Sequence, residues 1–187
     1  MAIELERPTL TREEFFALQE CEKGDIRGYE YEDGRLIPVS PVKGPQSSAW
    51  SDFMIELGYH VKHQGLGRIW LDLCVYLDPK GRRRYFPDIV YLANEDLHRY
   101  DGEVIMGPPT LVVEVSGKKS RERDRGPKKR AYHRAGVPWY WIVDVVTRQI
   151  EEYRWAAKGY ELVSQTPFEG TFSPQLFPGL TFSQIPA

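Results

Sequence analysis

The stretch Tyr85-Phe86-Pro87-Asp88-Ile89-Val90-Tyr91 is an apolar, β-branched run that carries one carboxylate, Asp88. A second run of this kind, Leu111-Val112-Val113-Glu114-Val115, carries Glu114. Because an unpaired carboxylate is costly to bury, two of them on strands that can lie side by side indicate a shared cation. Mg²⁺ binds one or two carboxylates and keeps positions for phosphate and water, as in a metal-dependent phosphodiesterase. The alternative is that each carboxylate forms a structural ion pair with a neighbouring arginine.

The chain as a whole has the composition of an ordinary globular protein, with 187 residues, 41% hydrophobic and 28% charged. This length predicts a single domain, residues 1–187, with a sizeable core. No segment approaches about 18 consecutive apolar residues, and the N-terminal stretch does not resemble a signal peptide. Cys21 and Cys74 stand far apart, which is typical of reduced thiols. We therefore expect a cytoplasmic protein without a membrane span.

Positive charge is concentrated in one segment, although the net charge of the chain is only −2. Residues 118–134 contain nine Lys or Arg against two acidic residues, so this segment carries +7 and the rest of the chain about −9. A basic segment directly after the Glu114 strand is suited to hold a phosphate backbone. The alternative is a solvated helix face. The candidate nucleic-acid contacts are Lys118, Lys119, Arg121, Arg125 and Lys129.

The N-terminal half is expected to contain two helices and a hairpin. Thr11-Arg12-Glu13-Glu14 fits a capping box, which predicts a helix over 12–20. Asp33-Gly34 separates two alternating segments within 27–39, which is a strong hairpin signal. A second helix is predicted from about 47 to 63, where apolar residues recur at helical spacing.

Strands alternate with one long helix in the rest of the chain. This helix should occupy 119–135 and end at Gly136, with Pro127 either in a first turn or at a kink. The order of elements predicts an α/β fold in which a mixed β-sheet packs against helices. Strands are expected at 68–77, 86–92, 110–116 and 139–145, followed by a hairpin of 149–155 and 160–163.

Four segments resemble a known protein family: YEYEDGRLIPVSP, PDIVYL, LVVEVS and RDRGPKKRAYHRAGVPWYWIVD. They are similar to the Uma family of restriction-endonuclease-like proteins, which belongs to the PD-(D/E)xK nuclease superfamily. The similarity spans roughly residues 25–155, and its most specific part runs from Arg123 to Asp144. It implies a restriction-endonuclease-like core, a central mixed β-sheet flanked by helices, which here has an N-terminal helix and β-hairpin.

The resemblance also implies roles for individual residues. Asp88 matches the motif aspartate and Glu114 the motif glutamate, and both would bind Mg²⁺ or Mn²⁺. Ser116 stands where the motif lysine is usual. Lys128, on the following helix, matches the lysine that replaces it in this family, and Lys118 is the alternative because it is nearer in sequence.

Other positions are secondary candidates. Glu30, in the hairpin, matches an acidic position of the family and is a further catalytic candidate. Asp72 is a candidate to reach the same site, whereas Asp144 ends an apolar strand and is more typical of a turn or cap. The family commonly has a histidine at the start of the second helix, where this chain has Gln46, Ser47 and Ser48. Trp139-Tyr140-Trp141 is expected in the core or at an interface.

These features support three functional hypotheses. The first is a metal-dependent endonuclease that hydrolyses DNA, with Asp88 and Glu114 binding Mg²⁺ and Lys128 assisting. Cutting both strands of a duplex needs two active sites, so a homodimer is expected with it. The alternative is a catalytically impaired nucleic-acid-binding or scaffold protein on the same fold, which the absent motif lysine favours. The third is an enzyme that acts on RNA or on a small phosphoester.

Overall fold

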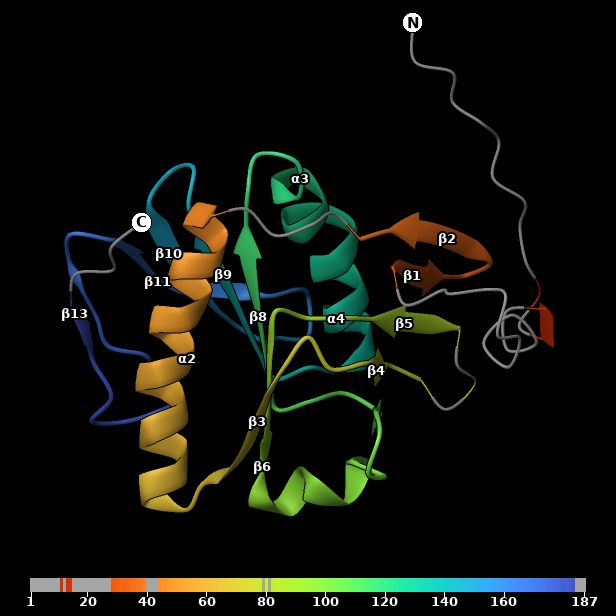
Figure 1. Cartoon of the computed structure of the whole chain (residues 1–187), viewed down its shortest axis with the longest axis horizontal. Coiled ribbons are helices and arrows are strands. Elements are labelled where there is room, and N and C mark those ends of the chain that lie inside the picture. Colours follow the sequence, from red (N-terminus) through yellow and green to blue (C-terminus); the bar gives the residue numbers. More distant parts are fainter. Residues whose placement is uncertain are drawn as a thin grey trace, which may run out of the picture.

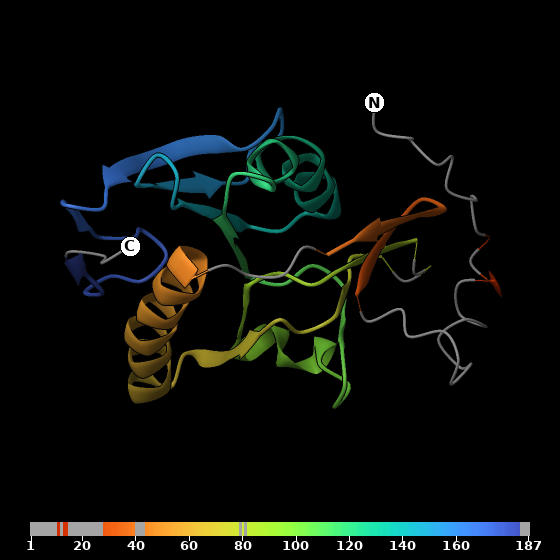
Figure 2. The same cartoon turned by 45° about the horizontal axis from the view of Figure 1, so that its top comes forward.

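A computed structural model describes residues 11, 13–14, 28–39, 44–78, 80 and 82–183. It confirms an α/β fold in which helices lie on both sides of a mixed sheet (Figures 1 and 2). The predicted N-terminal helix at 12–20 lies almost entirely outside the described residues. Its capping box is present, because Thr11 N–H donates to Glu14 Oε2 at 2.7 Å and Glu14 N–H donates to Thr11 Oγ1 at 3.2 Å.

Two sheets hold most of the strands. The larger has six strands in the order β11-β10-β9-β8-β6-β3, and the smaller has five in the order β2-β1-β5-β4-β7. The elements are β1 (Tyr29–Glu32), β2 (Arg35–Pro38), α2 (Gly44–Gln64), β3 (Gly67–Leu71), β4 (Val75–Tyr76), β5 (Arg83–Tyr85), β6 (Ile89–Ala93), the 3₁₀ helix η1 (Asn94–Arg99), β7 (Ile105–Met106), β8 (Leu111–Ser116), α3 (Arg121–Arg123), the π-helix η2 (Asp124–Lys128), α4 (Lys129–Ala135), β9 (Trp139–Asp144), β10 (Gln149–Arg154), β11 (Glu161–Pro167), β12 (Thr171–Phe172) and β13 (Phe182–Ser183).

Strand β8 is central in the larger sheet. It pairs antiparallel with β6, where Ile89 lies opposite Val113, and parallel with β9, where Glu114 lies opposite Ile142. All six of its residues are buried. This placement explains why the strand is apolar on both faces and confirms the strand predicted there.

The two faces of the sheet pack against different helices. Val113 shares a core with Phe53 of α2, and Val112 shares a core with Tyr132 of α4. In Figure 1 the ribbon of β8 accordingly lies between α2 and the α3–α4 segment. Because side chains alternate along a strand, Glu114 points to the same face as Val112, toward α4. The alternation of side chains along β8 therefore decides that the buried Glu114 carboxylate faces α4 and not α2.

One predicted strand is wrong. Residues 68–77 form two short strands in different sheets, β3 and β4, and the chain turns between them at Asp72. Asp72 has a left-handed φ of 48°, and its N–H donates to Asp88 O at 3.3 Å. Aspartate tolerates this conformation better than most residues, so the break needs neither glycine nor proline. Without glycine or proline at this turn, the pattern of apolar residues gives no sign that the strand is interrupted.

The long basic helix is present but has an internal irregularity. It begins at Arg121, widens into the π-helix η2 around Pro127, and continues as α4. A π-turn accommodates a proline because it changes the hydrogen-bond partners of the residues around it. The helix ends at Gly136, whose φ is 83°, as the sequence predicts.

The aromatic segment Trp139-Tyr140-Trp141 belongs to the interior. Tyr140 and Trp141 are fully buried and Trp139 packs against the core, so the core alternative is confirmed for this segment. Only Trp139 of this segment keeps part of its surface exposed. Among the described residues, no helix is long and apolar enough to cross a membrane.

Two glycine substitutions should have opposite effects on stability. Gly136→Ala places a β-carbon at a left-handed φ of 83° and should lower the free energy of unfolding by about 1 kcal/mol. Gly58→Ala, inside α2, would make an ordinary contact with Met54 Cε at 3.4 Å and should raise it by roughly 0.5–1 kcal/mol. Urea denaturation of both variants measures these changes. A neutral Gly136→Ala would contradict the left-handed helix end.

Candidate active site

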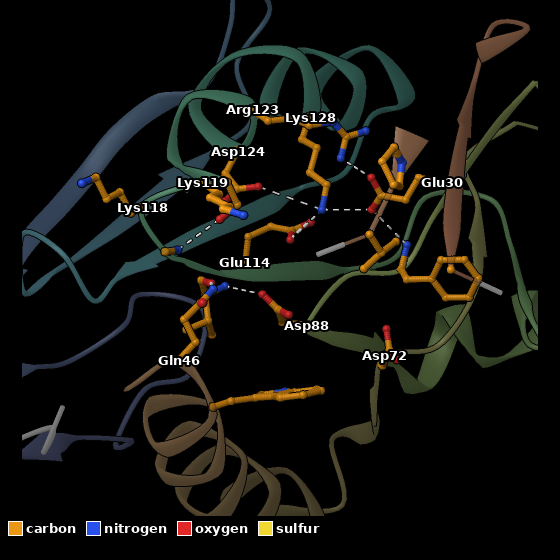
Figure 3. Close-up of a pocket in the computed structure, with 18 residues that line it drawn as sticks. Glu30, Gln46, Asp72, Asp88, Glu114, Lys118, Lys119, Arg123, Asp124 and Lys128 are labelled. Carbon is orange, nitrogen blue, oxygen red and sulfur yellow. Dashed lines mark hydrogen bonds and ion pairs between the residues drawn. The ribbon is translucent and has the colours of Figure 1, made fainter. Parts of the chain in front are cut away.

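A cleft of about 510 Å³ opens beside Glu114, which is buried, and Asp88, which is half-buried. Its walls come from α2, the β1–β2 hairpin, the segment before β6, and the β8–α3 region (Figure 3). The lining residues are Gly28, Glu30, Pro38, Val39, Gln46, Trp50, Asp72, Phe86, Asp88, Glu114, Val115, Gly117, Lys118, Lys119, Ser120, Arg123, Asp124 and Lys128. The cleft therefore gathers side chains from segments that are far apart in the sequence.

Asp88 and Glu114 come together through the pairing of β6 with β8. Asp88 Oδ2 accepts a hydrogen bond of 2.6 Å from Val115 N–H, the peptide that follows Glu114. Burial raises the pKa of Asp88 to about 7, although Lys128 and the Val115 N–H act in the opposite direction. Burial likewise raises the pKa of Glu114 to about 8, against the influence of Lys128. Both carboxylates thus lie where an additional positive charge would be favourable.

Lys128 reaches Glu114 from the helix. Its Nζ lies 2.9 Å from Glu114 Oε2, 3.0 Å from Glu30 Oε1 and 4.0 Å from Asp124 Oδ1. Burial alone would lower the pKa of Lys128, but Glu114 and Glu30 raise it well above its ordinary value, so the ammonium group stays charged. Lys118 lines the same cleft without an ion pair to these carboxylates in the described part of the chain.

Two hydroxyl groups fix the carboxylates around Lys128. Tyr132 Oη donates to Glu114 Oε1 at 2.7 Å, from one turn beyond Lys128 on the same helix. Ser116, in the usual lysine position of the motif, donates through Oγ to Asp124 Oδ2 at 2.6 Å. Neither Asp124 nor the tyrosine bond was predicted from the sequence. The only available signal was spacing, because 124, 128 and 132 are four residues apart and share a helix face.

Glu30 enters the site from the hairpin. It is buried, and besides Lys128 its carboxylate is ion-paired with Arg123. Burial would raise the pKa of Glu30, but Lys128 and Arg123 together hold it below its ordinary value. Arg123 also lies 3.9 Å from Glu32. Glu30 is therefore an ionised carboxylate shared by two cations of one helix.

The five candidate nucleic-acid contacts fall into two groups. Lys118 and Lys119 line the cleft. The other three have partners within the protein. Asp144 Oδ2 binds Arg121 at 2.7 Å and Arg125 at 2.8 Å, and Lys129 Nζ lies 3.2 Å from the centre of the Tyr153 ring. Asp144 also accepts the N–H groups of Val146 and Thr147, as expected for a carboxylate in a turn.

Gln46 and Asp72 complete the walls of the cleft. Gln46 donates through Nε2 to Val115 O at 2.9 Å, at the start of α2. It also fills the space beside Gly117, where a β-carbon would lie only 2.6 Å from Gln46 Cδ. Asp72 projects its carboxylate toward the cleft in Figure 3, and burial and Glu30 raise its pKa. Its position fits the suggestion that it reaches the site.

The donor set suits a hard divalent ion. Asp88 and Glu114 offer carboxylate oxygens, the ligands that Mg²⁺ and Mn²⁺ prefer. Among the described residues, no three His, Cys, Asp or Glu side chains are arranged to hold a metal ion by themselves. Two protein carboxylates, with water and phosphate completing the coordination, is the arrangement usual for Mg²⁺.

Removing the charge of Lys128 should destabilise the fold. Lys128→Met leaves Glu114 and Glu30 buried without their shared cation, which should lower the free energy of unfolding by about 3–5 kcal/mol. Adding Glu114→Gln should restore part of this loss, because it removes one uncompensated charge. Lys62→Met, at an exposed position of α2, is the matched control. Chemical denaturation of these three variants and of Glu114→Gln alone measures the coupling, and a loss below about 1 kcal/mol for Lys128→Met would exclude a buried ion pair.

Asp88→Asn should stabilise the metal-free protein at high pH. Because the pKa of Asp88 is raised in the folded state to about 7, ionisation destabilises the fold increasingly as the pH rises from about 4 to 7. The variant should therefore exceed the wild type by about 1–4 kcal/mol at pH 8 and match it near pH 4. Thermal unfolding with a chelator, across this pH range, measures the difference. A difference independent of pH would show that Asp88 titrates normally.

Comparison with known proteins identifies the family of the chain and a structure with a similar fold. Residues 12–185 match the Uma2 family, which is described as "Putative restriction endonuclease". A crystal structure of a putative nuclease belonging to DUF820 from Anabaena variabilis ATCC 29413 superposes with a TM-score of 0.70 at 20% sequence identity, covering 91% of this chain and 93% of that one. A search of curated proteins finds no match. The chain therefore belongs to the Uma2 family and shares the fold of that crystal structure.

Proposed function

We propose that this protein is a metal-dependent endonuclease that hydrolyses phosphodiester bonds of DNA. The observation that carries the proposal is the meeting of Asp88, Glu114 and Lys128 in one cleft, from three separate elements. Membership in a family named for restriction endonucleases supports the same activity. Asp88 and Glu114 would hold Mg²⁺ or Mn²⁺, which when bound supplies an activated water and stabilises charge on the phosphate.

The residues around the carboxylates would perform the remaining tasks. Tyr132 orients Glu114 through its hydroxyl, so the carboxylate has a fixed direction before any ligand arrives. Lys128 presents a permanent positive charge beside Glu114, where it can stabilise negative charge that develops on the phosphate. Glu30 holds Lys128 from the opposite side, so its role is to position the lysine.

Lys118 and Lys119 are the best-placed residues to hold the DNA backbone, since both line the cleft. Arg121, Arg125 and Lys129 would contribute to a positive surface while they keep their partners within the protein. Double-strand cleavage would need two active sites, so the proposal includes a homodimer on duplex DNA and a cytoplasmic location. Sedimentation with and without DNA tests the dimer.

A catalytically impaired nucleic-acid-binding or scaffold protein is the second candidate. It is favoured by Ser116, which stands in place of the motif lysine and is bonded to Asp124. The position of Lys128 favours the enzyme instead, because its ammonium group occupies the neighbourhood of Glu114 that a motif lysine would serve. The two candidates can be distinguished by cleavage, because the endonuclease would cut DNA and the binding protein would leave it intact.

Cleavage of plasmid and single-stranded DNA in Mg²⁺ or Mn²⁺ is the deciding measurement. We expect the wild type and the exposed-lysine control Lys62→Met to cut, and Asp88→Asn and Glu114→Gln to lose more than about a hundredfold in rate. Calorimetric titration with Mn²⁺ should show uptake that both carboxylate variants lose. These two substitutions are preferable to Lys128→Met, whose loss of activity could reflect unfolding. DNA binding without cleavage or metal uptake would establish the second candidate.

A further inference from the structure

Two aromatic side chains line the cleft beside the carboxylates. Trp50 comes from α2, and Phe86 comes from the segment that leads into β6. Both are partly exposed, although Trp50 also packs against the core. Water solvates the carboxylates well and the rings poorly, so a flat apolar group bound in the cleft would cover ring surface favourably.

The ring of Phe86 is held in place from one side. The guanidinium group of Arg84 lies over it, with Cζ 4.9 Å from the ring centre. Arg84 is itself buried and donates through Nη2 to Tyr29 O at 2.8 Å. The backbone N–H of Phe86 points to Glu30 Oε1 at 3.4 Å. The ring is therefore braced by the hairpin, only two residues from Asp88.

Trp50 lines the cleft from α2. It lies four residues after Gln46, on the same face of α2, and Gln46 is fixed to Val115 O. Its ring also packs against the apolar core, which limits its movement. Figure 3 places Asp88 between Gln46 on the α2 side and Glu30 on the β1 side. The carboxylates thus share their cleft with two aromatic residues, which come from different segments of the chain.

Cations and aromatic rings in one groove are the two components of sites for single-stranded nucleic acid. Lys118 and Lys119 supply the cations, and Phe86 and Trp50 supply the rings. In a duplex the faces of the bases are covered by their neighbours, so a ring next to the reacting phosphate has no base to stack on. In an unpaired strand each base offers a free face.

We propose that the cleft binds an unpaired DNA strand, with the base next to the reacting phosphate stacked on Phe86 and the α2 side of that nucleotide bounded by Trp50. This inference rests on the proposed nuclease function and specifies its substrate as single-stranded DNA or a locally opened duplex. Arg84 acts as a positioning residue, because it touches the ring of Phe86 and holds it against the hairpin.

Binding measured without metal tests the inference. Fluorescence anisotropy in the presence of a chelator would compare a labelled single-stranded oligonucleotide with its duplex, for the wild type, Phe86→Ala, Phe86→Leu and Phe86→Tyr. Leucine keeps most of the apolar volume but removes the aromatic face, so it separates stacking from folding. Tyr59→Ala, at a position of α2 that is 69% exposed, is the aromatic control outside the cleft.

We expect tighter binding of the single strand than of the duplex. Phe86→Ala and Phe86→Leu should weaken it roughly five- to a hundredfold, the range for loss of one base–aromatic stack, while Phe86→Tyr and Tyr59→Ala leave it unchanged. Single abasic positions along the oligonucleotide should reproduce the loss at one position only. Equal affinity for the duplex, or no effect of Phe86→Leu, would overturn the inference.

Failure of the inference can be told apart from failure of the proposed function. Metal-dependent cleavage of duplex DNA that is insensitive to Phe86→Leu would retain the nuclease and reject the unpaired substrate. Single-strand binding that depends on Phe86, without cleavage in Mg²⁺ or Mn²⁺, would support the stacking site and reject the enzyme. Absence of binding to either form of DNA would overturn both.

Discussion

The buried ammonium group of Lys128 is the interaction on which the site depends. It connects β8 through Glu114, β1 through Glu30 and its own helix through Asp124, so one charge holds together three parts of the chain. Burying charges costs more than one ion pair usually returns, and the arrangement is stable only when every partner is present. The sheet, the hairpin and the helix are therefore held in a fixed relation around the cleft, and the positions of the remaining side chains follow from it.

The carboxylates around Lys128 differ in how well nearby positive charge balances their negative charge. Glu30 is shared by two cations and its pKa is lowered, whereas burial raises the pKa of Asp88 and of Glu114. Buried carboxylates whose ionisation is unfavourable cost stability, and proteins commonly keep them where function requires them. A bound divalent ion would supply the missing positive charge. The same two groups that make the metal-free fold less stable at neutral pH are thus the groups best suited to attract the ion.

Many cations of the basic segment, residues 118–134, are paired within the protein, so its net charge overstates the positive charge of the surface. Lys128 and Arg123 are ion-paired with Glu30. Arg121 and Arg125 are both ion-paired with Asp144. Much of the positive charge neutralises acidic side chains from other segments. Of the remaining cations, Lys118 and Lys119 line the cleft, and Arg130 and Arg134 are exposed outside its lining.

Most local elements, and the chemistry carried by two of the apolar segments, can be predicted from neighbouring residues alone. Alternation predicted the hairpin at Asp33-Gly34, unbroken apolarity predicted β8, and Gly136 marked the helix end, because each depends on neighbours in the chain. Buried carboxylates in apolar strands, with the family motif, pointed to Asp88 and Glu114. Only the tertiary structure decided that β3 and β4 separate at Asp72, and that Glu30 meets Arg123 across 93 residues of sequence. Those contacts depend on which distant strands pair. The periodicity of apolar residues shows which face of a segment is buried, but it does not show which other segment covers that face.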